Sequence, residues 1–135
     1  MSAEVLLRIA ALAHLGLMAA GILMPRVVGL RDHLRPLPEF IRRLFWVYYT
    51  FIGLCLAGFG LGTFVLAEEL ASGTVLARAV CGFLAVFWTL RLVVAMCVFN
   101  LESYLTDEWR RAGLASANLV FACLPVLYGW IAFRK

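Results

Sequence analysis

Four long apolar runs constrain the fold of this chain more than any other feature of its sequence. They cover about residues 5–24, 44–67, 79–99 and 114–133. Each approaches or exceeds the about 20 residues that a helix needs to cross the hydrocarbon core of a bilayer. Spanning strands would show alternating apolar and polar side chains, which these runs lack. The sequence therefore predicts an all-α, polytopic membrane protein: one domain over residues 1–135, with four transmembrane helices in a compact bundle.

The composition supports a membrane environment. Of the 135 residues, 64% are hydrophobic and 15% are charged, whereas an ordinary soluble domain is nearer half apolar and a quarter charged. A soluble chain of this length cannot bury so much apolar surface. The net charge is +4, but no basic cluster with interleaved aromatic residues stands on a polar background, so we do not expect nucleic-acid binding.

The connection between the first two runs is predicted to lie at the membrane surface. Pro25 is expected to end the first helix, and Pro36 and Pro38 prevent one helix from running through the connection. Apolar residues here are interspersed with arginines, which is typical of an interfacial amphipathic segment that contacts anionic lipids. A short helix that begins at about Pro38 could continue into the second span. The membrane-surface arginines are Arg26, Arg31, Arg35, Arg42 and Arg43.

The distribution of positive charge predicts an orientation. With four spans, both termini and the connection between the second and third runs share one side of the membrane. That side carries Arg8, Arg78, Arg134 and Lys135, whereas the opposite side carries seven arginines: the five membrane-surface arginines together with Arg110 and Arg111. Lysine and arginine favour the cytoplasmic side, so this pattern predicts periplasmic termini.

Arg91 lies about two residues beyond the middle of the third run. An arginine at the bilayer centre costs about 2.5–3.5 kcal/mol on insertion scales, so it usually faces the bundle interior or a water-filled cavity. The inner parts of the runs contain no acidic residue that could pair with it. Candidate partners are the ring of Trp88, the hydroxyl of Tyr49, the side chain of Asn118 and a carbonyl freed by Pro125.

Two interpretations of Arg91 remain open at this point. Arg91 could bind an anionic group at mid-membrane, such as a lipid headgroup, a permeating anion or a carboxylate of a partner subunit. Alternatively, it could tie two helices together through carbonyls and hydroxyls, without a ligand. On the first interpretation, Arg91, His14, Trp88, Asn118 and Tyr49 form the candidate ligand-binding set.

His14 is the second polar residue at mid-membrane depth. Ala10, Ala11 and Gly21 share its helical face, which indicates that His14 points toward another helix. A neutral imidazole hydrogen-bonded across the bundle is the simplest interpretation. Haem ligation would need a second axial ligand from another chain, because His33 lies in the arginine-rich connection, away in depth. We expect no cofactor and no metal site.

Small residues in the second and fourth runs favour close helix packing. The second run contains Gly53, Gly58 and Gly62, and the last two form a GxxxG motif. In the fourth run, Ala122 belongs to a stripe of small residues. Such residues let helix backbones approach closely. The motif does not distinguish packing within the bundle from packing between chains.

Catalytic groups are not evident in the sequence. The four cysteines all lie in apolar runs, without CxxC pairs or a histidine at metal-ligand spacing, so we expect them to pack as small apolar side chains. No nucleophile is paired with a base, and no catalytic residue is predicted. The chain is therefore more readily interpreted as a protein without enzymatic activity.

Two segments carry a resemblance to other proteins. The runs "LFWVYYTFIGLCLAGFGLG" and "ARAVCGFLAVFWTLRLVV" resemble stretches of uncharacterised small bacterial membrane proteins with four predicted spans. The resemblance covers most of the second and third spans. It implies a location in the bacterial inner membrane and implies no activity.

These features rank the possible functions. The first is a small integral membrane binding or assembly protein, either a homo-oligomer or a subunit of a larger membrane complex, in which Arg91 engages a partner, a lipid headgroup or an anion. The alternative is an anion or lipid conduit, with Arg91 from several copies along the path. A membrane redox or lipid-modifying enzyme is a further alternative.

Overall fold

The computed structural model describes residues 2–98 and 107–134, which form helices joined by short connections. In chain order these are α1 (Ala3–Val27), α2 (Leu30–Leu34), α3 (Glu39–Val65), α4 (Ala67–Ala71), α5 (Val75–Cys97) and α6 (Glu108–Phe133). The long helices α1, α3, α5 and α6 are each apolar enough to cross a membrane. The predicted all-α class with four candidate spans is confirmed, and it indicates a multi-pass membrane protein.

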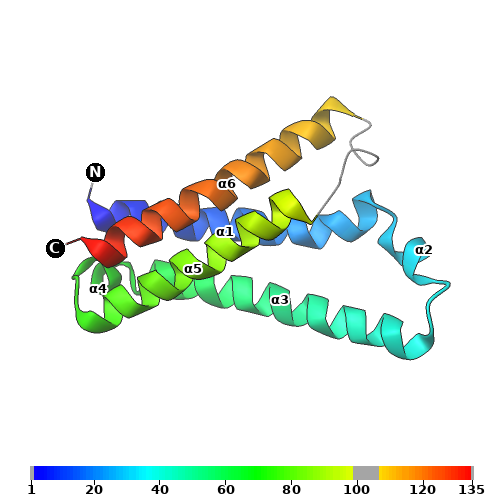
Figure 1. The fold of residues 1–135 in the computed structure, drawn as a ribbon, viewed down its shortest axis with the longest axis horizontal. Coiled ribbons are helices and arrows are strands. Elements are labelled where there is room, and N and C mark those ends of the chain that lie inside the picture. The colour runs from blue at the N-terminus through cyan, green and yellow to red at the C-terminus, as the bar shows by residue number, and fades with distance from the viewer. Residues whose placement is uncertain (1, 99–106, 135) are drawn as a thin grey trace.

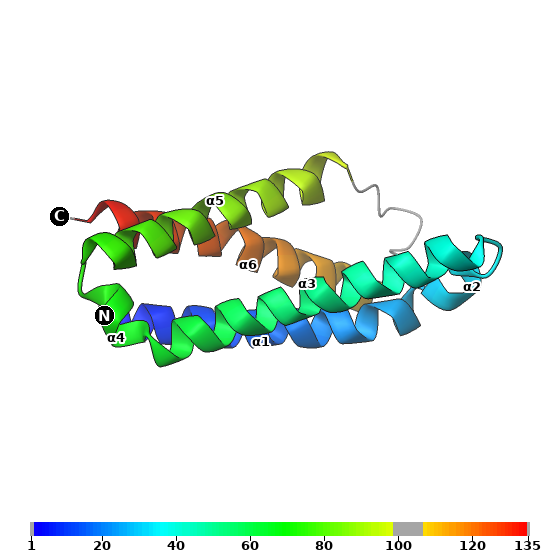
Figure 2. The ribbon, with the colours of Figure 1, turned by 90° about the horizontal axis from the view of Figure 1, so that it is seen from below.

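The four long helices are arranged as two pairs. α1 packs along α3 and α5 packs along α6, and these pairings supply most contacts between elements (Figures 1 and 2). The pairs meet through α4, which contacts α1, α3 and α5, and through a smaller contact between α1 and α6. α4 lies at the end of the bundle where α1 begins and α6 ends, whereas α2 lies at the opposite end (Figure 1). We call the two ends the α4 end and the α2 end.

The predicted separation of charged groups between two ends is present in the structure. At the α4 end, Arg8 pairs with Glu4 at 2.6 Å, and the Nε of Arg78 donates a hydrogen bond of 2.8 Å to the carbonyl of Ala132. The α2 end carries Arg31 on α2, Arg35 at its C-terminal cap, and Arg42 and Arg43 near the start of α3. Lys135 and the expected boundary of the third span at residue 99 lie outside the described residues.

Three helix starts have a local cause in the sequence. The hydroxyl of Ser2 accepts from the Val5 amide at the start of α1, and that of Thr74 accepts from the Ala77 amide at the start of α5. These bonds satisfy amides that have no partner inside the helix. Gly29 and Gly73 have φ angles of +60° and +75°, which other residues rarely adopt. They allow the tight turns that precede α2 and α5.

The prediction that Pro25 ends the first helix is wrong, because α1 continues to Val27. Proline lacks an amide proton and therefore cannot bond to the carbonyl four residues earlier, which here belongs to Gly21. The hydroxyl of Tyr49 on α3 donates to that carbonyl instead. A neighbouring helix thus satisfies the freed backbone group, which is how spanning helices tolerate proline.

The core lies in the half of the bundle next to the α4 end. It draws on the first half of α1, on α4, on the first half of α5 and on the last turns of α6. Its largest fully buried side chains are Leu7, His14, Thr63, Cys81, Trp88 and Tyr128. Toward the α2 end, few side chains of the long helices are buried. The two halves of the bundle therefore differ in how tightly they pack.

Candidate functional site

A fully buried hydrogen-bonded pair joins α1 to α5 in the core. The indole Nε1 of Trp88 donates to the Nε2 of His14 at 3.2 Å, and the His14 Nδ1 lies 2.7 Å from the carbonyl oxygen of Ala10. Because a carbonyl only accepts, Nδ1 carries the proton and Nε2 is the acceptor. His14 is thus a neutral imidazole with both nitrogens engaged. In this arrangement neither nitrogen offers a free lone pair to a haem iron or another metal.

A glycine on α3 makes room for this histidine. A Cβ atom added to Gly60 would lie 2.9 Å from the Cβ of His14, closer than side-chain carbons normally approach. α1 and α3 can therefore meet here only if residue 60 has no side chain. Sequence reasoning identified the glycine-rich character of this segment but selected other glycines as the packing positions.

A second buried hydrogen bond joins α3 to α6. The hydroxyls of Thr63 and Tyr128 lie 2.9 Å apart, and both side chains are almost completely buried. The Tyr128 ring also meets the His14 ring edge to face, with centroids 6.1 Å apart. Sequence reasoning missed both residues. A threonine and a tyrosine within apolar runs were the available signal, because buried hydroxyls usually have partners.

Arg91 lies above an aromatic ring of the adjacent helix. Its guanidinium carbon is 4.8 Å from the centroid of the Phe121 ring on α6. The Phe121 ring in turn stacks on that of Trp88, with centroids 5.7 Å apart. The ring contacted by Arg91 is therefore that of Phe121, whereas Trp88 directs its N–H toward His14. These contacts connect Arg91 to the buried histidine through two aromatic rings.

Three of the five predicted ligand-binding residues, His14, Trp88 and Arg91, are linked to one another through the contacts described above. Asn118 is half-buried on α6 and makes no hydrogen bond to any residue that the structure describes. The Tyr49 hydroxyl donates a hydrogen bond to the Gly21 carbonyl, and the Tyr49 ring stacks on that of Phe45, with ring centroids 5.9 Å apart. The His14–Trp88 hydrogen bond joins α1 to α5, the Thr63–Tyr128 hydrogen bond joins α3 to α6, and the contact between the His14 and Tyr128 rings connects the two. We call His14, Thr63, Trp88 and Tyr128 the polar core.

The predicted packing glycines do not lie at close contacts with any other helix that the structure describes. A Cβ atom added to Gly53, Gly58 or Gly62 would meet nothing within 4 Å. Gly60 lies half a helical turn from Gly58 and Gly62, so it occupies the opposite face of α3. Ala122 on α6 is half-buried. Within the bundle the close approach uses Gly60, and packing of the GxxxG face stays a prediction about another molecule.

Only one of the four cysteines packs in the core. Cys81 is fully buried on α5, whereas Cys55, Cys97 and Cys123 lie on the outer surface of the bundle. All four thiols are free. The expectation of apolar packing within the protein therefore fits Cys81, and the other three would face lipid.

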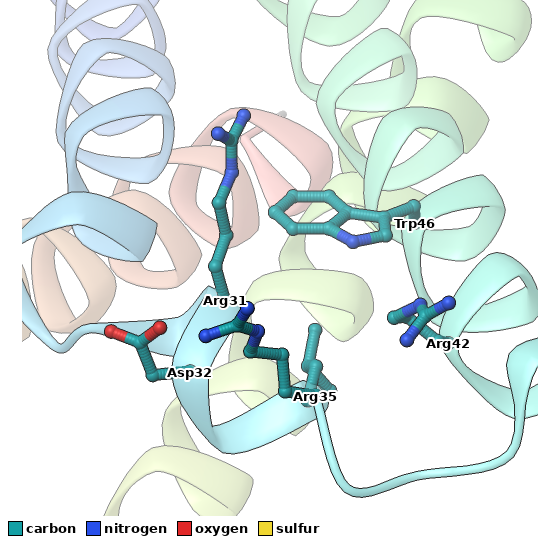
Figure 3. Close-up of a pocket in the computed structure, with 6 residues that line it drawn as sticks. Arg31, Asp32, Arg35, Arg42 and Trp46 are labelled. Carbon is teal, nitrogen blue, oxygen red and sulfur yellow. The ribbon is translucent and has the colours of Figure 1, made fainter.

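The membrane-surface arginines are not equivalent. Arg31 on α2 and Arg35, the C-terminal cap of α2, face Arg42 and Trp46 on α3 across a recess of about 630 Å³ (Figure 3). Leu34, which is buried, and Asp32 complete its lining. Arg43 instead forms an ion pair with Glu39, one turn away on α3. Arg26, in the last turn of α1, is also outside this lining. We call this feature the arginine recess.

Comparison with protein-family models, with curated proteins and with solved structures finds no match to this chain.

Proposed function

We propose that this chain is a small integral membrane assembly protein of the bacterial inner membrane, and that it associates with a second copy of itself through the outer face of α3. On this proposal the termini are periplasmic, as the arginine distribution favours. The proposal rests on α3 and not on Arg91, whose guanidinium lies over Phe121 within the same chain.

The observation that carries the proposal is the open space at Gly58 and Gly62. A glycine inside a helix costs about 1 kcal/mol relative to alanine. At Gly60 the absence of a side chain admits α1, but at Gly58 and Gly62 no atom of the described residues lies within 4 Å of an added Cβ. A close approach by another helix is the usual reason for a GxxxG motif in a membrane span.

The surroundings of these glycines also favour a partner helix. Of the four candidate spans, α3 has the smallest buried share, 6% against 17–22% for the others. Beside Gly58 and Gly62 lies a shallow, mostly apolar cavity of about 180 Å³ that extends to Phe83 on α5. This cavity offers room for a large side chain of a partner helix.

The residues along the outer face of α3 favour a second copy of this chain as the partner that packs there. Phe51, Cys55, Gly58 and Gly62 follow at intervals of four, three and four residues, so they form one stripe along α3. A two-fold symmetric interface requires one surface to be complementary to itself. This stripe supplies both a groove, at the glycines, and a bulky side chain, at Phe51, which is 60% exposed.

Cys55 provides a direct test, because it is exposed on this stripe. A variant that retains Cys55 as its only cysteine should form a disulfide-linked dimer when it is oxidised with copper–phenanthroline in dilute liposomes. The matched control retains only Cys97, which is exposed on α5, and should stay monomeric. Cross-linking of both variants to the same extent would indicate random collision and would contradict the proposal.

A second pair of variants tests the glycines themselves. Gly58→Leu should abolish the Cys55 cross-link, because a leucine would separate the two backbones. Gly16→Leu places the same side chain at an equally open glycine on α1 and should leave the cross-link unchanged. If Gly58→Leu cross-links like the wild type, α3 does not form the interface.

A further inference from the structure

A separate feature of the structure, independent of how the chain assembles, points to a ligand. The arginine recess brings together three guanidinium groups that are not consecutive in the sequence. Arg31 lies on α2, Arg35 caps the C-terminus of α2 four residues later, and Arg42 lies in the first turn of α3. The turn at Gly29 and the prolines between the helices fold α2 back toward α3. Figure 3 shows Arg42 and Asp32 at opposite sides of the recess.

These three arginines differ in their partners from three other arginines of the chain. Arg8, Arg43 and Arg110 each form an ion pair with an acidic residue three or four positions away. Within residues 2–98 and 107–134, none of the three recess arginines forms an ion pair. Three positive charges and the one negative charge of Asp32 leave the recess with an excess of two positive charges. Like charges at close range repel one another, and a bound anion would relieve that repulsion.

The depth of the recess points to a lipid. Trp46 lies one turn further into α3 than Arg42, and tryptophan in spanning helices concentrates at the membrane–water boundary. Further along α3, beyond Trp46, the apolar side chains of Val47 and Leu54 are 50% and 66% exposed. A ligand here would thus meet guanidinium groups at its polar end and apolar surface further into the membrane.

We propose that the arginine recess binds the phosphate group of an anionic phospholipid. Arginine pairs with phosphate oxygens through two parallel hydrogen bonds, which a lysine cannot form. Basic pockets of this kind between membrane helices are suited to anionic headgroups. The cavity, at about 630 Å³, is within the usual range for small-ligand sites. The lipid's acyl chains would run along the apolar surface of α3, beyond Trp46.

Native mass spectrometry of the purified full-length protein in neutral detergent tests this site. The probes are phosphatidylglycerol and phosphatidylcholine with identical acyl chains. The test variant combines Arg31→Gln, Arg35→Gln and Arg42→Gln. The matched control combines Arg26→Gln, Arg43→Gln and Arg111→Gln, which remove the same charge from the same end of the bundle without touching the recess. Helix content and elution volume verify that both variants are folded.

The wild type and the control should retain phosphatidylglycerol in preference to phosphatidylcholine, and the test variant should lose that preference by about tenfold or more. Equal loss in both triple variants would show attraction by diffuse surface charge and would overturn the site. If the triple test variant does not fold, Arg35→Gln alone is measured, because Arg35 is exposed at the end of the short α2. Retention equal to the wild type in that variant would overturn the proposal.

Inorganic phosphate at millimolar concentration distinguishes the two sources of a phosphate group. A lipid site gains from the acyl chains as well as the headgroup, so free phosphate should not displace bound phosphatidylglycerol. Displacement of the lipid by free phosphate would overturn the assignment to a lipid and would identify a soluble phosphate compound as the ligand.

Discussion

The two halves of this bundle treat polar groups in opposite ways. In the half next to the α4 end, the polar core pairs its hydrogen-bonding groups within the chain: His14 with Trp88 and Ala10, and Thr63 with Tyr128. At the α2 end, the arginine recess gathers like charges without an ion pair among the described residues. Buried groups must find partners inside the protein, whereas interfacial groups can take them from lipid. The contrast separates residues that hold the fold from residues available to a ligand.

The difference also explains where the bundle is tight. The polar core lies where α4 brings the two helix pairs together, and its hydrogen bonds cross between them. In lipid, apolar burial gives little drive for helix association, so packing and interhelical hydrogen bonds must supply it. Each pair alone would leave the His14 Nε2, the Trp88 indole N–H and the hydroxyls of Thr63 and Tyr128 without these partners. The polar core therefore favours this particular docking of the pairs.

The largest effect should come from deleting the central ring of the polar core. Trp88→Ala removes a fully buried indole and leaves His14 Nε2 without its donor. We expect a loss of about 3 kcal/mol in the free energy of unfolding, at the low end for a buried tryptophan because apolar burial contributes less in lipid. Titration with sodium dodecyl sulfate measures this loss. Trp109→Ala, at a site that is 87% exposed, is the control and should change stability by less than about 0.5 kcal/mol.

A smaller effect should follow from the hydroxyl pair. Thr63→Val and Tyr128→Phe each remove one partner of the bond between α3 and α6. Double-mutant cycles in membrane proteins give coupling energies of about 0.6 kcal/mol on average and about 1.7 at most. We therefore expect the double variant to be less destabilised than the sum of the single variants by an amount in this range. Strict additivity would mean that the two hydroxyls do not interact.

The sequence predicted the helices because their signal is local. Apolar runs of spanning length are visible without knowing any neighbour, and each run overlaps one long helix, although the helices begin two to six residues before the runs. The prediction that Pro25 ends the first helix was wrong for a different reason. A proline normally ends a helix, but here Tyr49 on another helix replaces the lost hydrogen bond. Nothing near Pro25 in the sequence indicates that partner.

The contacts of the polar residues could not be predicted in the same way. His14 and Trp88 are 74 positions apart, and Thr63 and Tyr128 are 65 apart. Their pairing depends on how the two helix pairs dock, which no single helix encodes. Helical phase also matters: Gly60 and Gly62 are two residues apart, yet only Gly60 faces α1. The sequence suggested an interior histidine and a glycine-rich face, but the partners depend on the assembled bundle.

The smallest effect on stability is expected from a substitution in the arginine recess. It tests directly whether the two halves of the bundle differ in what their polar groups do. Arg42→Gln removes a guanidinium that has no ion-pair partner among the described residues, and it lowers the repulsion from Arg31 and Arg35. In neutral detergent without added lipid, the free energy of unfolding should change by no more than about 0.5 kcal/mol. A ligand that binds only the folded protein adds stability in proportion to its affinity. Phosphatidylglycerol should therefore stabilise the wild type more than Arg42→Gln, whereas phosphatidylcholine should not distinguish them. A substantial loss of stability without lipid would instead mean that Arg42 holds the fold, as the polar core does, and that the two halves do not differ in this respect.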